Sequence, residues 1–253
     1  MPFVARVWHW QSLWWITVTA FTVLLKHHYS IATAADLEWI FQPLAILLEL
    51  FTGHIFQQDN YSEWVSYNAN IRLVKACAGI NFMIMSFLVY AWVFRPDSKE
   101  NTGCLTQFIG QFLLISAAII AAWATCLLAN SLRIIIAMEA ADQHWEIAIM
   151  GIDSKQLHRL IGMFIYIPLL SLQMTLCHCS ISRAVYPAIK ELHHNRLFYV
   201  PLFLYFIITV FVPIMTGNAF YKPDQFMEHV LHLLGVTLLF AIILKLKRYL
   251  LSS

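Results

Sequence analysis

Long apolar runs, separated by short polar segments, dominate the pattern of this chain. A membrane-spanning helix needs roughly 20 mostly apolar residues. About seven runs approach that length, over residues 7–25, 38–53, 79–94, 104–138, 157–176, 197–215 and 226–244. We therefore predict an all-α polytopic membrane protein with about seven transmembrane helices.

Two segments depart from the simple alternation of spans and loops. The fourth run continues to Met138 without a turn residue, too long for one simple crossing and too short for a hairpin of two. It predicts one long helix whose end projects beyond the hydrocarbon and carries Asn130 and Arg133. Residues 54–74 are polar and aromatic, with a turn signal at Asn68-Ala-Asn70. They predict a short extended or hairpin segment directly before the third span.

Composition agrees with a membrane protein. Of 253 residues, 60% are hydrophobic and 12% are charged, whereas a soluble domain carries roughly 25% charged residues. The chain has no repeat, linker or low-complexity tract, so residues 1–253 are interpreted as one integral membrane domain. The net charge of +2, without a basic run, gives no sign of a nucleic-acid partner, and the expected surroundings are the lipid bilayer.

The cysteines do not form a structural framework. Five of them are scattered along the chain, which argues against a set of disulfides. Cys177-His-Cys179 has the spacing of a metal-binding fragment, but a zinc site needs about four ligands and the sequence holds no matching pair. We therefore expect no metal and no cofactor.

Basic residues predict the orientation in the membrane. They gather in the loops 95–101 and 180–196 and in the C-terminal tail, and these segments alternate onto one side. The positive-inside rule makes that side cytoplasmic, which predicts a multi-pass protein of the cell (inner) membrane. Met1 lies outside if the first two runs both cross. The external ends of spans three, four and five then carry Cys77, Arg133 and His158.

Cys77 stands where the polar segment meets the third span. A thiol at a helix N-terminus feels the positive end of the helix dipole, which favours the nucleophilic thiolate. Gly79 removes side-chain bulk beside it, and Asn81 would share its helix face and could donate an amide hydrogen bond. By position alone, Cys77 could also be a small buried apolar residue.

A Cys, an Arg and a His at one depth suit acyl transfer. The thiolate attacks a carbonyl, the imidazole of His158 moves protons, and the Arg133 guanidinium stabilises developing negative charge. Asn130 lies three residues before Arg133 and could orient it. Alone, Arg133 could anchor a helix to headgroups and His158 could cap a helix. The alignment of all three favours a catalytic site.

Three motifs resemble the signature blocks of the exosortase/archaeosortase family. They are Ala76-Cys-Ala-Gly-Ile-Asn-Phe82, Ala129-Asn-Ser-Leu-Arg-Ile134 and Leu157-His-Arg-Leu-Ile-Gly162. They follow the family's order, each at the outer end of a predicted span, and the first is closest to the exosortase K branch. The resemblance covers about residues 37–180. The chain departs from the family at Ala78, where many members have Ser, and in its about seven spans, which is short for the family.

The resemblance implies a membrane cysteine protease or transpeptidase. Its partners would be exported proteins whose C-terminal sorting signal combines a short motif, a transmembrane helix and a basic tail. Cys77 would be the nucleophile that forms a thioester, His158 the general acid/base and Arg133 the charge stabiliser. The supporting residues would be Gly79, Asn81 and Asn130. An amine or another surface acceptor would resolve the acyl-enzyme on the external face, and the family is often associated with exopolysaccharide production.

Two other classes of function are open. The 11 His residues are compatible with a haem or quinone protein, but axial ligands must lie inside helices and face one another. Only His229 and His232 lie well within a predicted span. The second alternative is a transporter or a non-enzymatic assembly partner, for which broken helices and midplane charges are typical. Glu49 is the one candidate charge. A haem absorption band would identify the first alternative, and slow labelling of an inert Cys77 would favour the second.

Overall fold

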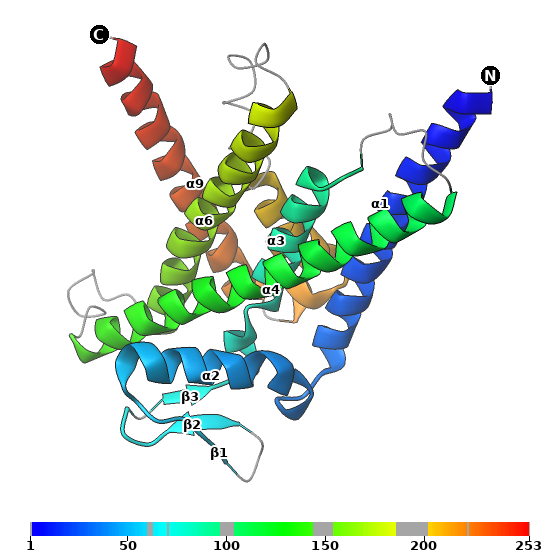
Figure 1. Cartoon of the computed structure of the whole chain (residues 1–253). Helices are drawn as coiled ribbons and strands as arrows, with labels where there is room; N and C mark the ends of the chain where they lie inside the picture. The colour runs from blue at the N-terminus through cyan, green and yellow to red at the C-terminus, as the bar shows by residue number, and fades with distance from the viewer. Residues whose placement is uncertain are drawn as a thin grey trace.

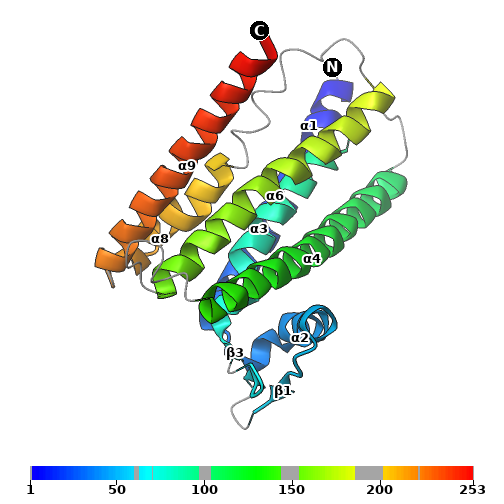
Figure 2. The same ribbon diagram turned by 90° about the vertical axis from the view of Figure 1, so that its left-hand side faces the viewer.

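A bundle of long helices, with a small layer across one of its ends, makes up the protein. The computed structural model describes residues 2–59, 63–69, 71–96, 104–143, 154–185, 202–221 and 223–252. Helix α2 (Glu38–Thr52) and a small sheet form the layer, while both chain termini lie at the opposite end of the bundle (Figures 1 and 2).

Most of the predicted spans correspond to helices. The long helices are α1 (Pro2–Ile31), α3 (Ile80–Val93), α4 (Cys104–Asp142), α6 (Ser154–Val185) and α9 (Pro223–Ser252). A shorter apolar helical segment covers Leu202–Met215, and we call it the 202–215 segment. It contains a π-helical turn at Ile207–Phe211 and ends with α8 (Val212–Met215).

Three of the described helical segments are long and apolar enough to cross a membrane. They are Lys75–Val93, Leu105–Asp142 and Gln156–Leu176. The prediction of one long fourth helix is confirmed, because α4 has 39 residues and is therefore about 58 Å long. Helix α6 continues to Val185, so the first part of the predicted 180–196 loop is helical. The rest of that loop lies outside the described residues.

The second predicted span has a different structure. Helix α2 has 15 residues and is about 22 Å long, shorter than the roughly 30 Å of bilayer hydrocarbon. It lies across the end of the bundle (Figure 2). One face buries Leu44 and Leu48, while Ile46 and Leu50 are exposed on the other. A helix with two apolar faces has the composition of a span, which is why the sequence predicted one, but α2 is not among the described segments that are long enough to cross.

The hairpin before α3 is confirmed and has a third strand. Strands β1 (Gln57–Gln58), β2 (Trp64–Ser66) and β3 (Ile71–Leu73) form an antiparallel sheet in that order. Ser66 pairs with Ile71 in the predicted hairpin. The side chain of Leu73, at the end of β3, is fully buried. This burial fixes the position at which the chain leaves the sheet and enters the turn before α3.

Helix α3 lies at the centre of the bundle, packed against α1, α4 and α6. Its run of apolar residues is continuous because the helix is buried on nearly all sides. One polar residue on it, Ser86, makes two hydrogen bonds with Gln173 of α6. Ser86 Oγ donates to Gln173 Oε1 at 3.0 Å, and Gln173 Nε2 donates to the Ser86 carbonyl at 3.0 Å. We call these two residues the Ser86–Gln173 pair.

Candidate active site

Cys77 lies in a short 3-10 turn, Lys75–Ala78, between β3 and α3. We call it the Cys77 turn. Gly79 separates it from α3 with a φ of 69°, a left-handed conformation that glycine adopts at low cost. A Cβ at Gly79 would lie 3.2 Å from the Asn130 side chain and 3.2 Å from Cys126 Sγ. Gly79 is therefore required both for the backbone conformation and for the close packing against α4.

This break corrects the expected relation between Cys77 and Asn81. The two residues are not on one helix face, because the chain reverses its backbone twist at Gly79 before α3 begins at Ile80. The Asn81 Oδ1 atom accepts a hydrogen bond from Lys26 Nζ of α1 at 2.6 Å. Asn81 still borders the cavity described below, but as a partner of Lys26.

The C-terminal end of α1 holds the Cys77 turn in place. Lys75 Nζ donates to the carbonyls of Ser30 at 3.1 Å and Ala32 at 2.7 Å, where a helix end favours a cation. Tyr29 Oη donates to the Lys75 carbonyl at 3.3 Å. Sequence reasoning missed these contacts because they join residues more than 40 positions apart.

Helix α4 contacts the turn from the other side. Asn130 Nδ2 donates to the Cys77 carbonyl, and Cys126 Sγ lies 3.4 Å from the Gly79 carbonyl as a weak donor. The Cys77 side chain itself is only 8% exposed. Cys126, which the sequence left without a role, thus packs directly behind the candidate nucleophile.

Arg133 is the centre of the polar contacts. Its Nη2 hydrogen-bonds to His158 Nε2, and its Nη1 donates to Tyr166 Oη at 2.9 Å and to Asn130 Oδ1 at 3.4 Å. The predicted meeting of Arg133 with His158, and its contact with Asn130, are confirmed. Because a guanidinium cannot accept a hydrogen bond, Nε2 must be the acceptor. The geometry thus assigns a neutral His158 with its proton on Nδ1.

Tyr166 is the site residue that sequence reasoning missed. Its Oη donates to Asn130 Oδ1 at 2.8 Å, and its ring stacks on Phe82 of α3 with centroids 4.4 Å apart. A signal was present, because His158, Gly162 and Tyr166 follow one another at intervals of four residues. On one helix these positions share a face. We call Asn130, Arg133, His158 and Tyr166 the site cluster.

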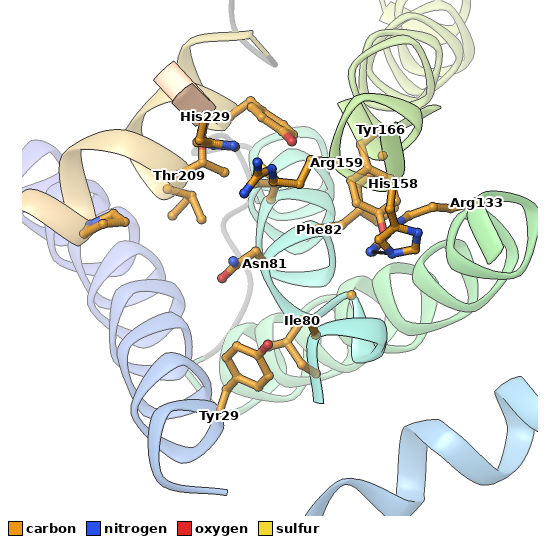
Figure 3. A pocket seen from close by; sticks show the side chains of 17 residues that line it. Tyr29, Ile80, Asn81, Phe82, Arg133, His158, Arg159, Tyr166, Thr209 and His229 are labelled. Atoms are coloured by element: carbon orange, nitrogen blue, oxygen red, sulfur yellow. Dashed lines mark hydrogen bonds between the residues drawn. The ribbon is translucent and has the colours of Figure 1, made fainter. Parts of the chain in front are cut away.

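A cavity of about 270 Å³ lies beside the site cluster. Arg133, His158 and Tyr166 gather where α4 and α6 meet, and Arg159 and His229 extend the wall toward α9 (Figure 3). Of the described residues, Ala76 and Gly79 on either side of Cys77 reach the wall, whereas the Cys77 side chain does not. The candidate nucleophile therefore lies between two residues of the cavity wall without lining the cavity itself.

One donor of Arg133 remains free. Among the described residues, the buried Nε–H of Arg133 has no hydrogen-bond partner. A Cβ at Gly162 would lie 3.4 Å from this Nε, so the glycine leaves open the space next to it. Arg133 and Gly162 both line the cavity. Arg133 therefore carries a buried cationic donor, next to the cavity, that the described residues leave unpaired.

The described residues contain no group of three or more His, Cys, Asp or Glu side chains that could hold a metal ion. Arg159 of the cavity wall pairs with Glu228 at 2.7 Å. Comparisons with protein-family models, with curated proteins and with solved structures find no match for this chain. Known proteins therefore give no information on the chemistry of this site, and its function is inferred from its geometry.

Proposed function

We propose that this protein is a membrane cysteine transpeptidase of the exosortase type, acting on exported proteins with a C-terminal sorting signal. The observation that carries the proposal is the direct hydrogen bond between Arg133 and His158 at the edge of a cavity beside the Cys77 turn. His158 of α6, Arg133 of α4 and the Cys77 turn before α3 lie at the same end of the bundle, which would bring together a base, a cation and a thiol. The three sequence motifs supply these same residues.

The reaction would proceed by acyl transfer. His158 takes the thiol proton, Cys77 Sγ forms a bond to the scissile carbonyl carbon, and the developing oxyanion receives the free Nε–H of Arg133. His158 returns the proton to the leaving amine as the C–N bond breaks, which leaves a thioester on Cys77. An amine or another surface acceptor then attacks the thioester and releases the thiol.

The resting arrangement adds a step before the chemistry. Arg133 occupies His158 Nε2, which is the only lone pair of a neutral imidazole that carries its proton on Nδ1. His158 becomes available as a base when the guanidinium turns toward the substrate oxygen. Binding of the correct carbonyl and release of the base are thereby coupled.

The proposed topology has six crossings, made by α1, α3, α4, α6, the 202–215 segment and α9. Helix α2 lies at the outer surface. Both termini are at the same end of the bundle (Figure 1), so in this topology Met1 is cytoplasmic, unlike in the seven-span arrangement. The site cluster then faces the exterior of the inner membrane. Reporter fusions at Met1 and Ser253 should both give cytoplasmic signals, and an external N-terminal reporter contradicts the six-span topology.

The test of the function is processing of a tagged substrate with a sorting signal, expressed together with this protein. Cys77→Ala should abolish cleavage while the protein remains in the membrane, because the proposed thioester forms on the Cys77 thiol. The matched control replaces Cys104, Cys177 and Cys179 together and should retain activity. Hydroxylamine should cleave the thioester and release the substrate as a hydroxamate, and loss of this product in Cys77→Ala assigns the acyl-enzyme to Cys77. Full processing by Cys77→Ala would exclude the mechanism.

A further inference from the structure

The hydroxyl of Tyr166 lies between the guanidinium of Arg133 and the amide of Asn130, with hydrogen bonds of 2.9 Å and 2.8 Å. We propose that Tyr166 is a positioning residue that acts through Asn130 on the backbone carbonyl of Cys77. This inference rests on the proposed function, because it concerns how the nucleophile is held. Among the described residues, Tyr166 hydrogen-bonds to Arg133 and Asn130, so its route to the Cys77 turn passes through the Asn130 amide.

Hydrogen bonds link Arg133, Tyr166, Asn130 and the Cys77 carbonyl in a row. Their directions follow from which of these groups can only donate and which can only accept. Arg133 can only donate, so Tyr166 Oη accepts from it and must give its own single proton to Asn130 Oδ1. With Oδ1 occupied by donors, the Nδ2 group of Asn130 is turned toward the Cys77 carbonyl, to which it donates. The amide oxygen and nitrogen have nearly the same shape. Their orientation is fixed because Arg133 can only donate to Oδ1 and the Cys77 carbonyl can only accept from Nδ2.

Removing the hydroxyl should release the amide. Asn130 Oδ1 would keep only the 3.4 Å contact from Arg133 Nη1, which is at the long limit for a hydrogen bond. The amide would lose its shorter donor and be held less firmly in the orientation that lets Nδ2 donate to the Cys77 carbonyl. The Cys77 turn would then be less well fixed. The phenyl ring of Tyr166→Phe would still stack on Phe82, so packing is retained.

The first experiment compares two Tyr→Phe variants by steady-state processing. Tyr166→Phe should lower kcat about 10-fold with little change in KM, since a hydrogen bond in a charge-polarised chain is lost. Tyr90→Phe is the matched control. Tyr90 Oη also hydrogen-bonds between two helices of the bundle, to Thr125 Oγ1 at 2.9 Å, but it is not part of the site. Unchanged kcat in Tyr166→Phe, or an equal loss in Tyr90→Phe, overturns the proposal.

The second experiment asks whether the effect passes through Asn130. In an Asn130→Ala background, or Asn130→Ser where the alanine variant is poorly inserted, adding Tyr166→Phe should produce no further loss of kcat. In an Arg133→Lys background it should still lower kcat. An equal additional loss in the Asn130 background would show that Tyr166 acts by another route, and the proposal would fail.

Alkylation of Cys77 can be measured without a substrate, so it tests the role of Tyr166 independently of the proposed function. The alkylation rate of Cys77 by a small thiol reagent reports how the turn is held, in a protein in which Cys104, Cys177 and Cys179 are replaced and the fully buried Cys126 is kept. Tyr166→Phe and Asn130→Ala should change this rate by the same factor, and together by no more than either alone. If this holds while no processing occurs, the relay stands and the transpeptidase assignment fails. If processing depends on Cys77 but the rate is insensitive to Tyr166, only the relay fails.

Discussion

The helix bundle contains two clusters of buried polar side chains, the Ser86–Gln173 pair and the site cluster. They differ in whether their hydrogen bonds are complete. The Ser86–Gln173 pair is closed, because its two side chains satisfy each other with reciprocal hydrogen bonds. The site cluster is open, because it borders a cavity and leaves the Arg133 Nε–H without a partner among the described residues. Both are well buried, with Gln173 at 6% and Arg133 at 8% exposure.

The comparison shows that burial and polarity alone do not mark a functional site. Inside a membrane, a satisfied polar pair between helices contributes about 0.6 kcal/mol to stability on average, which is the role of the Ser86–Gln173 pair. A buried cation with an unused donor is costly unless something completes it. The site cluster therefore has the composition of a ligand site, and the following predictions test that distinction.

The largest effect is expected at His158. His158→Ala should reduce turnover roughly 100- to 10,000-fold, the usual contribution of a general acid/base. Arg133→Lys should lose less, because the charge is kept while the planar fork that serves both Tyr166 and His158 is lost. Turnover of a tagged substrate in membranes is the measurement. His144, which lies outside the described residues, is the matched control, and His144→Ala should retain most activity. A dead His144→Ala with an active His158→Ala would reassign the base.

Gly79→Ala should damage both stability and activity. A left-handed backbone costs an L-residue roughly 1–2 kcal/mol, and the new Cβ would also press on Asn130 and Cys126 at 3.2 Å. Gly53→Ala is the matched control, since Gly53 has a φ of 72° but nothing within 4 Å of its Cβ position. Thermal unfolding in detergent should show a larger fall in Tm for Gly79→Ala. Equal shifts for the two variants would mean that the contact with α4 is unimportant.

Gly162→Ala should slow turnover about 10-fold, the loss of one charge-assisted hydrogen bond, with little change in Tm. Its Cβ would make an ordinary contact of 3.4 Å with Arg133 Nε, so the fold tolerates it while the approach of a substrate oxygen is blocked. Gly110→Ala on α4 has nothing within 4 Å and serves as the control. Normal kcat in Gly162→Ala would show that the free Nε–H is not the oxyanion donor.

The sequence predicted what depends on local spacing and helix ends. Asn130 and Arg133 are one helical turn apart, and the order of the spans brought Arg133 and His158 to one end of the bundle. The continuous helix through Cys77 and Asn81 was wrong, because apolar periodicity does not reveal the positive φ of Gly79. The four-residue spacing that leads to Tyr166 was readable, but an aromatic residue within an apolar span usually indicates packing.

The sequence did not predict contacts between distant segments or the orientation of α2 relative to the bundle. Nothing near Lys75 indicates that it caps the end of α1, since the two segments meet only after the bundle has formed. Helix α2 has enough apolar residues to be predicted as a span, and only its 15-residue length and transverse position correct this. Hydropathy counts apolar residues and does not distinguish lipid-facing from protein-facing sides of a helix.

The smallest effects on turnover are expected at the Ser86–Gln173 pair, and they decide whether the comparison is sound. Gln173→Leu should cost at most about 1 kcal/mol of stability, because the freed Ser86 hydroxyl can turn to a carbonyl four residues earlier. Thr125 of α4 makes such a bond to Ala121 at 2.8 Å. Ser86→Ala should cost more, about 1–3 kcal/mol, because Gln173 Oε1 is then buried without a donor.

The double variant Ser86→Ala with Gln173→Leu removes both partners, so it should be more stable than Ser86→Ala alone. Tm in detergent measures these differences. Turnover should stay within about twofold of the wild type in all three variants, since the pair has no unused donor to offer a substrate. A loss of kcat as large as that expected for Gly162→Ala would show that a closed polar pair also serves the reaction. The presence of an unpaired donor beside a cavity would then not distinguish the site cluster from the Ser86–Gln173 pair.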